Sequence, residues 1–517
     1  MSIPLLSLVT FLPLAGAVLL IFLPKENKRG LYGVALAFTA VTFALSLPLL
    51  VDFDAATADP QFVERTNWLG FGLEYHVGLD GISLYLVLLT TLLMPLAILA
   101  SWSYIRVRLK EYLFFMLLLE TGIIGVFVSL NLFLFYVFWE AALIPMYFLI
   151  GIWGGKRRVY ATTKFVLFTM AGSLLMLVAA FVLYAAYFRA TGTYSFQIFD
   201  LYRLSLSPQL QTWLFLAFGL AFAIKVPMFP FHTWLPDAHV EAPTAGSVIL
   251  AAVLLKMGAY GFLRFAIPLF PDAAARFAPI LAVLALIGII YGGLMALVQK
   301  DVKSLVAYSS VSHMGLIMLA IFAGTVAGVQ GAIYQMLNHG LSTGMLFLCV
   351  GILYERAHTR LIKDFGGVAK QMPVFAAFFL VAVLSSAGLP GLNGFVGEIL
   401  CLFGIFAANK VWAALAVTTV ILAAAYLLWM FQRVMHGPIA NEKIRSFQDL
   451  NKRELFYLIP VVILMFWMGI FPGTFLRKMD ASVNQYVNRL KNREKVFVAR
   501  PIAPPLPAAG ARAGRAK

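Results

Sequence analysis

Four charged side chains lie inside long apolar stretches of this sequence: Glu140, Lys225, Lys256 and Glu398. If such a stretch crosses a membrane, a charge at its centre costs about 2.5–3.5 kcal/mol, so several charges there must be paired or functional. Burial can lower the pKa of a lysine to about 5–6 and raise that of a glutamate to about 8–9, which lets the two types exchange protons near neutral pH. We therefore predict that these four groups form a proton path.

The alternative interpretation is structural, because the same groups could lock helices together as ion pairs. Pairing does not exclude function, since a Glu140–Lys225 pair that opens and closes would act as a switch. Two further charges lie in apolar segments. We leave Glu120 open between helix packing and function. We interpret Lys164, which lies close to the basic residues 156–158, as a side chain that snorkels to the surface.

Histidines accompany these charges. His313 and His339 lie in apolar segments beside Ser, Thr and Asn residues, which can support a hydrogen-bonded water chain. Imidazole both donates and accepts protons, which favours a relay over simple packing or haem ligation. His232 and His239 flank Trp234-Leu-Pro-Asp237 in an expected loop near the cytoplasmic surface. They would form a proton inlet or belong to a solvated turn.

No redox or nucleotide-binding motif is visible. Gly70-Phe-Gly72 begins like a dinucleotide fingerprint, but Tyr75 and the lack of a βαβ pattern argue against one. Cys349 and Cys401 form no CxxC motif, and no Walker A sequence is present. We expect no cofactor or metal to be bound by this chain. A pump of this kind needs an external energy source, which implies a partner.

The composition indicates a membrane protein. Of 517 residues, 62% are hydrophobic and only 12% are charged, whereas a soluble domain carries roughly 25% charged residues. The net charge of +16 is spread over short loops, so we reject nucleic-acid binding. The apolar segment 3–23 lacks a basic start and a cleavage site, which indicates a retained helix rather than a signal peptide.

We expect an all-α integral membrane fold with about fourteen transmembrane helices, because apolar runs of bilayer length recur throughout. The expected spans are 3–23, 31–51, 81–101, 113–131, 132–153, 162–188, 211–231, 245–268, 277–298, 304–324, 328–354, 374–407, 410–430 and 456–475. Proline-containing segments should break helices 7 and 12, at Lys225-Val-Pro-Met-Phe-Pro230 and Gly388-Leu-Pro-Gly-Leu-Asn-Gly394. Broken membrane helices persist where they are packed in protein or line a wet cavity.

The two breaks predict an internal repeat of two inverted five-helix units, with the site near the broken helices. The resulting organisation is helices 1–3 in 1–112, the first unit in 113–268, the second in 277–430, a loop and helix 14 in 431–475, and a basic C-terminal tail in 476–517. Lys and Arg concentrate in the loops that follow odd-numbered spans. The positive-inside rule therefore assigns those loops to the cytoplasm and the N-terminus to the outside, with the basic tail as an exception.

Several motifs resemble those of the antiporter-like subunits of respiratory complex I, over about residues 80 to 430. They are Phe138-Trp-Glu-Ala-Ala-Leu-Ile-Pro-Met-Tyr147, Lys225-Val-Pro-Met-Phe-Pro-Phe-His-Thr-Trp-Leu-Pro-Asp-Ala-His239, Glu241-Ala-Pro-Thr-Ala-Gly-Ser247, Leu305-Val-Ala-Tyr-Ser-Ser-Val-Ser-His-Met-Gly315 and Gly388-Leu-Pro-Gly391. Chain length, the absence of a long lateral helix after the last span, and Glu rather than Lys at 398 favour one branch of this family.

The resemblance implies fourteen helices and proton pumping, driven by electron transfer from NADH to quinone in neighbouring subunits. It implies that Glu140 and Lys225 are a coupled pair, Lys256 the central relay and Glu398 the exit-side group. His313 and His339 would belong to the connecting hydrophilic axis. FMN and iron–sulfur clusters would lie in partner subunits, and quinone would be the substrate of the whole complex.

The expected partners are other membrane subunits of complex I, including neighbouring antiporter-like subunits, and the lipid bilayer. The expected location is the bacterial inner membrane, with the mitochondrial inner membrane as the alternative. A subunit of a multi-chain sodium/proton antiporter is the closest rival function, because it shares these motifs. A non-transporting structural scaffold is a rival from another class.

Overall fold

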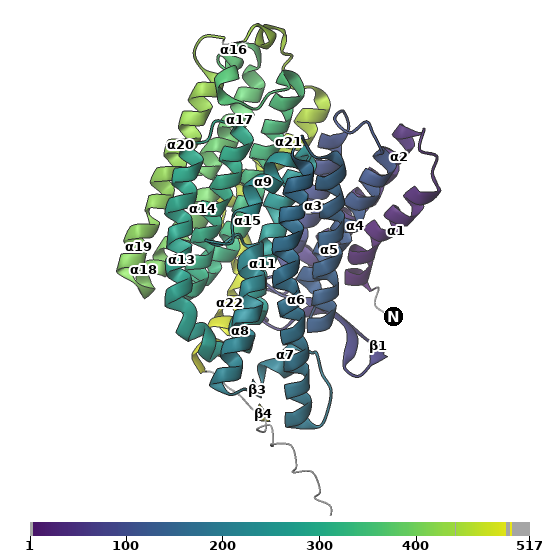
Figure 1. The fold of residues 1–517 in the computed structure, drawn as a ribbon, viewed down its shortest axis with the longest axis vertical. Helices are drawn as coiled ribbons and strands as arrows, with labels where there is room; N and C mark the ends of the chain where they lie inside the picture. Colours follow the sequence, from purple (N-terminus) through teal and green to yellow (C-terminus); the bar gives the residue numbers. More distant parts are fainter. Residues whose placement is uncertain (1–3, 440, 493–496, 499–517) are drawn as a thin grey trace, which may run out of the picture.

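The structure, a computed structural model, describes residues 4–439, 441–492 and 497–498. Most helices run side by side along the long axis of the molecule (Figure 1). In the described part of the chain, 12 helical segments are long and apolar enough to cross a membrane. They are α1 (Leu5–Phe22), α2 (Lys28–Val51), α3 (Leu84–Ser101), α4 (Leu109–Val128), α5 (Leu132–Trp153), α6 (Arg158–Thr191), the composite helix Thr244–Leu269, α13 (Pro271–Leu297), α14 (Val302–Phe322), α15 (Val326–Ala357), the composite Lys410–Met435 and α21 (Lys452–Ile470).

The remaining elements are shorter or more polar. The helices are α7 (Ile198–Tyr202), α8 (Pro208–Lys225), α9 (Trp234–Glu241), η3 (Ile362–Asp364), α16 (Val368–Gln371), α17 (Pro373–Ser386), α18 (Asn393–Ala408), η4 (Glu442–Ser446) and α22 (Gly473–Asn492). The strands are β1 (Gln61–Gly70), β2 (Leu73–Leu79), β3 (Leu204–Ser205) and β4 (Phe497–Val498). The composite helix 410–435 consists of α19 (Lys410–Ala416) and α20 (Thr418–Met435).

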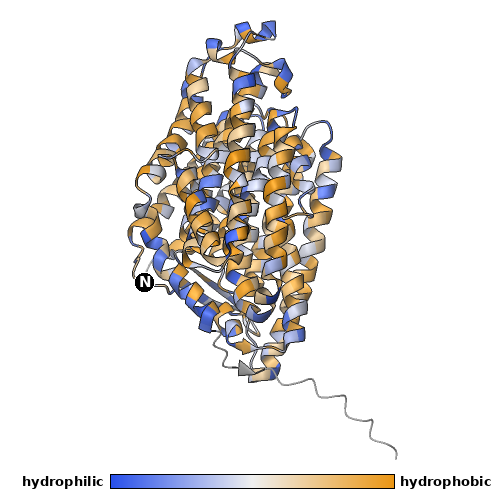
Figure 2. Ribbon diagram, turned by 90° about the vertical axis from the view of Figure 1, so that its left-hand side faces the viewer, coloured by the Kyte–Doolittle hydropathy of each residue, from blue (hydrophilic) through white to orange (hydrophobic). Residues whose placement is uncertain are grey.

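The helices differ in how much of their surface is covered by protein. The apolar windows of segment 244–269 and of α15 are 100% buried, whereas that of α2 is only 28% buried. Apolar residues cover the flanks of the molecule, and polar residues gather at its ends (Figure 2). An apolar helix with an uncovered side fits a lipid environment. Segment 244–269 and α15 therefore form the protein-enclosed centre, and they carry Lys256 and His339.

Both predicted helix breaks are present. Helix α8 ends at Lys225, and α9 begins only at Trp234. The segment between α17 and α18 contains Gly388 with φ +76° and Gly391 with φ +93°, conformations that favour glycine. The helical membrane fold is thereby confirmed, while the count of fourteen spans, the inverted repeat and the unit boundaries stay predictions.

Segment 244–269 contains an irregularity that the sequence did not reveal. It consists of α10 (Thr244–Ile249), η1 (Leu250–Leu254), α11 (Leu255–Gly261), η2 (Phe262–Ala266) and α12 (Ile267–Leu269), and both η1 and η2 are π-helical. A π turn is rare and often lies at a functional site. Lys256 belongs to the α-helical turns between the two π turns.

Two further elements were not predicted. Strands β1 and β2 form an antiparallel hairpin, in which a hydrogen bond from Arg65 lowers the pKa of the Glu74 carboxyl. Helix α22 forms the first part of the predicted basic tail, and buries Met479, Val483 and Val487 on one face. The rest of that tail, apart from residues 497–498, lies outside the described residues.

Candidate proton-transfer site

Lys256, His339, His313 and Glu398 form one connected line of side chains through the centre of the molecule. The Nζ atom of Lys256 lies 2.6 Å from Nδ1 of His339. The rings of His339 and His313 have centroids 5.8 Å apart. Nδ1 of His313 lies 3.5 Å from a carboxylate oxygen of Glu398. Each residue is at most 3% exposed, so the line is closed off from solvent.

Close helix packing brings these four residues together. Gly340, next to His339, packs so tightly that an added Cβ would lie 2.9 Å from the carbonyl oxygen of Ala252 on segment 244–269. The Nζ atom of Lys256 also donates to the carbonyl of Ala251, within η1. The π turn thus supplies a backbone acceptor that fixes the ammonium in place. The sequence identified all four residues, but it could not show that they touch.

His313 and Glu398, in the half of the line away from Lys256, have additional neighbours. Nε2 of His313 lies 3.3 Å from the hydroxyl of Tyr426 on α20. A Cβ at Gly388 would collide with a carboxylate oxygen of Glu398, so the predicted break after α17 leaves room for this group. Nδ1 of His313 and the Glu398 oxygen that faces it at 3.5 Å form no hydrogen bond among the described residues. These atoms therefore have capacity to take part in proton transfer.

Glu140 and Lys225 are arranged differently. Lys225 is 2% exposed, and its Nζ lies over the rings of Trp139, at 5.2 Å, and Phe165, at 5.9 Å. Glu140 is close enough to act electrostatically on Lys225, but no ion pair joins them in the described part of the chain. One carboxylate oxygen of Glu140 is buried without a partner among these residues. The predicted pair is therefore open in this structure.

His232 and His239 are both buried, at 3% and 0% exposure, so the interpretation as a solvated turn is wrong. The expected loop contains helix α9, and the surrounding helices cover both rings. His239 stacks on Phe347 with ring centroids 4.8 Å apart. Phe347 also lines a cavity of about 460 Å³, whose other lining residues include Glu241 and Lys303. Neither ring nitrogen of His239 has a partner among the described residues.

The two residues whose interpretation was uncertain have different surroundings. Lys164 forms an ion pair with Asp237 at 2.8 Å, with side chains 21% and 29% exposed. Its ammonium therefore meets a carboxylate of α9 rather than simply reaching the surface. Glu120 is 0% exposed, and neither of its oxygens has a partner among the described residues. Its role stays open.

One buried ion pair escaped the sequence interpretation. Arg264 donates to Asp80 at 2.6 Å, and both side chains are 7% exposed. The hydroxyl of Tyr260 accepts a further bond from Arg264 at 3.2 Å. Arg264 lies within the expected span 245–268, so its charge was a visible signal. Asp80 lies just outside an apolar run, which is why the pairing was not predicted.

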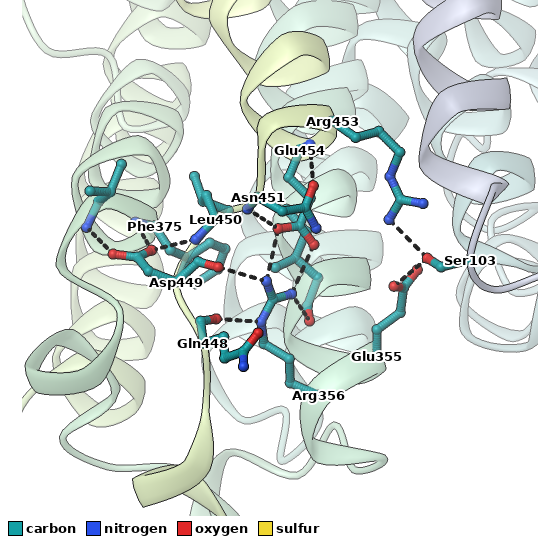
Figure 3. A network of polar contacts seen from close by, with 12 residues as sticks. Ser103, Glu355, Arg356, Phe375, Gln448, Asp449, Leu450, Asn451, Arg453 and Glu454 are labelled. Carbon is teal, nitrogen blue, oxygen red and sulfur yellow. Dashed lines mark hydrogen bonds and ion pairs between the residues drawn. The ribbon is translucent and has the colours of Figure 1, made fainter.

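A polar network joins the end of α15 to its neighbours (Figure 3). Arg356 donates to both oxygens of Glu454, at 2.9 and 2.8 Å. Ser103 donates to Glu355 at 2.7 Å and accepts a bond from Arg453 at 2.9 Å. The network connects α15, α21 and the segment after α3, so it fixes one end of the helix that carries His339.

Comparison with known proteins gives consistent matches over most of the chain. A family profile described as NADH:quinone oxidoreductase/Mrp antiporter, TM, matches residues 129–423. Another, described as NADH-ubiquinone oxidoreductase chain 4, amino terminus, matches residues 8–126. The chain is 49% identical to NADH-quinone oxidoreductase subunit M of Rhodobacter capsulatus, over 93% of this chain and 96% of that protein. It is 45% identical to NADH-ubiquinone oxidoreductase chain 4 of Arabidopsis thaliana, over 93% and 96%.

Solved structures show the same fold. A chain of respiratory complex I from Thermus thermophilus with bound NADH superposes with a TM-score of 0.85 at 36% identity, over 94% of this chain and 99% of that chain. A chain of the Mrp complex from Dietzia sp. superposes with a TM-score of 0.82 at 19% identity, over 96% and 100%. The second similarity indicates a shared fold alone.

Proposed function

Because this chain belongs to the NADH-quinone oxidoreductase subunit M (chain 4) family, we propose that it carries protons through Glu140, Lys225, Lys256 and Glu398. The branch of the complex I family that chain length and Glu398 predicted, subunit M or chain 4, is thereby confirmed. The chain is an integral membrane subunit of respiratory complex I, and bacterial relatives imply the plasma membrane. The observation that supports the residue assignment is the connected line Lys256–His339–His313–Glu398.

In the second half of the proposed path, from Lys256 to Glu398, the proton moves between groups that are already neighbours. The Lys256 ammonium donates to Nδ1 of His339, and the proton on Nε2 of that ring leaves toward His313. Imidazole can accept at one nitrogen and release at the other, so each ring passes charge without moving far. His313 then donates to Glu398, which delivers the proton to the exit side.

In the first unit, the open Glu140–Lys225 pair acts as a switch. An approaching Glu140 stabilises the charged form of Lys225, and its departure leaves the ammonium free to pass its proton onward. The end of α8 packs directly against α11, where an added Cβ at Gly258 would lie 2.9 Å from the backbone nitrogen of Val226. A movement of the backbone at the break after Lys225 would therefore displace the helix that carries Lys256.

His239 serves as a proton inlet in this scheme. It is covered by Phe347, which lines the cavity that contains Glu241 and Lys303, and it carries two ring nitrogens without partners among the described residues. His232 lies against Phe229 and Tyr291, with ring centroids 5.6 and 5.2 Å away. Its Nδ1 atom is also without a partner there, which makes it a second inlet group.

The energy comes from partner subunits in this proposal. FMN and iron–sulfur clusters reside there, quinone is the substrate of the whole complex, and this chain binds no cofactor itself. Neighbouring antiporter-like subunits pack on either side within the membrane. A sodium/proton antiporter subunit is the second candidate, because the family profile that matches residues 129–423 is named for Mrp antiporters as well as for NADH:quinone oxidoreductase. Co-purification of flavin and iron–sulfur proteins with this chain favours the first candidate, and their absence favours the second.

The decisive experiment measures NADH-driven proton uptake by vesicles that contain the assembled complex. We expect Glu140→Gln and Lys225→Ala each to abolish uptake, because each removes one member of the switch. Glu26→Gln, which changes an exposed carboxylate, is the matched control and should leave uptake unchanged. Uptake at the wild-type rate in both switch variants, with the complex intact, would refute the residue assignment.

A further inference from the structure

A basic cavity of about 430 Å³ lies between the start of α2 and the segment that follows α3. Three of its lining residues are cations, Lys28, Arg29 and Arg106, and all three are exposed. No acidic residue lines it in the described part of the chain. The positive end of the α2 dipole adds to this potential, because Lys28 is the first residue of that helix. The cavity therefore favours an anion.

The position of the cavity indicates what carries that anion. It adjoins the start of α2, whose apolar window is 28% buried, and so it opens beside a surface that faces lipid. Trp102, which is 37% exposed, stacks on Tyr32 with ring centroids 4.4 Å apart. Tryptophan and tyrosine gather at the boundary between membrane and water. The start of α2 lies at the opposite end of the bundle from the β1 hairpin (Figure 1).

We propose that this cavity binds the headgroup of an anionic phospholipid. Arg29, Arg106 and Lys28 would contact its phosphate groups, since guanidinium and ammonium groups form charge-assisted hydrogen bonds with phosphate oxygens. The acyl chains would lie along the uncovered apolar side of the first two helices, where Phe22 is 78% exposed and Val41 48% exposed. A soluble anion would gain nothing from that apolar surface. Basic pockets between membrane helices are suited to such lipids.

The cavity also adjoins the polar network of Figure 3. Ser103 lines the cavity and, at the same time, bridges Glu355 and Arg453. A bound headgroup would therefore hold the segment after α3 in the position that this network requires. Since Glu355 belongs to α15, lipid binding would stabilise the end of the helix that carries His339.

The test uses the purified complex, stripped of lipid and returned to bilayers of phosphatidylcholine alone or with phosphatidylglycerol. Native mass spectrometry then counts phosphatidylglycerol molecules retained by this subunit. We expect Lys28→Gln/Arg29→Gln/Arg106→Gln to lose one of them, and Arg106→Gln alone to lower the affinity about fivefold. The control Lys363→Gln/Lys370→Gln/Lys443→Gln removes three exposed cations elsewhere and should retain the lipid.

Four results would overturn the proposal. The first is equal loss in the control, which would indicate a general effect of net charge. The second is equal retention of phosphatidylcholine, which would remove the need for an anionic headgroup. The third is displacement by millimolar inorganic phosphate, which would assign the cavity to a soluble anion. A crosslink from Arg106→Cys to a neighbouring subunit would likewise replace the lipid with protein.

Discussion

The two halves of the proposed path show opposite arrangements of the same chemical groups. In the second half, Lys256, His339, His313 and Glu398 lie within contact distance or nearly so. In the first half, Lys225 lies over aromatic rings and makes no ion pair with Glu140 in the described part of the chain. The half from Lys256 to Glu398 therefore has the fixed geometry of a proton conductor. The half that contains Glu140 and Lys225 has the open geometry of a switch.

The largest effect on proton uptake is expected at Lys256, the first residue of the line that ends at Glu398. Replacing Lys256 with Met removes the only ammonium that contacts His339 in the described residues, while keeping an unbranched side chain. Loss of a proton-transfer group typically lowers a rate by about 100-fold or more. We expect proton uptake by reconstituted complex to fall to background in Lys256→Met. Lys363→Met, on an exposed segment, is the control, and uptake above one tenth of wild type in Lys256→Met would contradict the fixed-line interpretation.

A smaller effect is expected at the two aromatic rings, of Trp139 and Phe165, that face Lys225 in the proposed switch. Trp139→Leu removes the nearer of the two rings that face Lys225. A desolvated cation–π contact contributes about 2 kcal/mol, so we expect uptake to fall roughly thirtyfold. The pH at which uptake is half-maximal should also change, because loss of the ring would favour the neutral amine of Lys225 over its ammonium form. Trp213→Leu, on a side chain that is 65% exposed, should change neither quantity.

The smallest effect is expected beside the fixed line. The hydroxyl of Tyr426 contacts His313 at 3.3 Å and interacts electrostatically with Glu398, but no hydrogen bond joins it to Glu398 in the described part of the chain. A neutral hydrogen bond contributes about 1 kcal/mol, so Tyr426→Phe should lower uptake by roughly fivefold at most. Tyr334→Phe, which removes a buried hydroxyl bonded to the Met468 carbonyl, is the control. A complete loss in Tyr426→Phe would mean that the hydroxyl belongs to the path itself.

The sequence was sufficient to predict individual charges but not their connections. A lysine such as Lys256 is conspicuous in an apolar run, because the membrane makes it energetically unfavourable. Prolines likewise revealed the break after Lys225. Which helices become neighbours depends on packing between distant segments, as at Gly340 and Ala252, and no local pattern encodes that. The π turns depend on the same packing, so they were missed for the same reason.

Other omissions have a different physical origin. The strands of the β1–β2 hairpin, of 10 and 7 residues, mix polar and apolar residues and are too short to cross a membrane as helices, so a search for long apolar runs passes over them. Asp80 lies at the edge of an apolar run, and only the folded chain shows that it compensates Arg264. The solvated-turn alternative for His232 and His239 is wrong because both side chains are buried and each ring lies against an aromatic neighbour. A polar residue beside a broken helix can therefore be more deeply buried than its sequence suggests.

The rings around Lys225 have a consequence for leakage. An aromatic face attracts a cation through its quadrupole, yet it has no lone pair that can take a proton at neutral pH. Trp139 and Phe165 therefore hold the ammonium while withholding an acceptor from it. A carboxylate in that position would offer the proton an immediate destination. In the proposed path, these two rings would keep the charge on Lys225 between transport cycles and would limit proton leakage across the membrane.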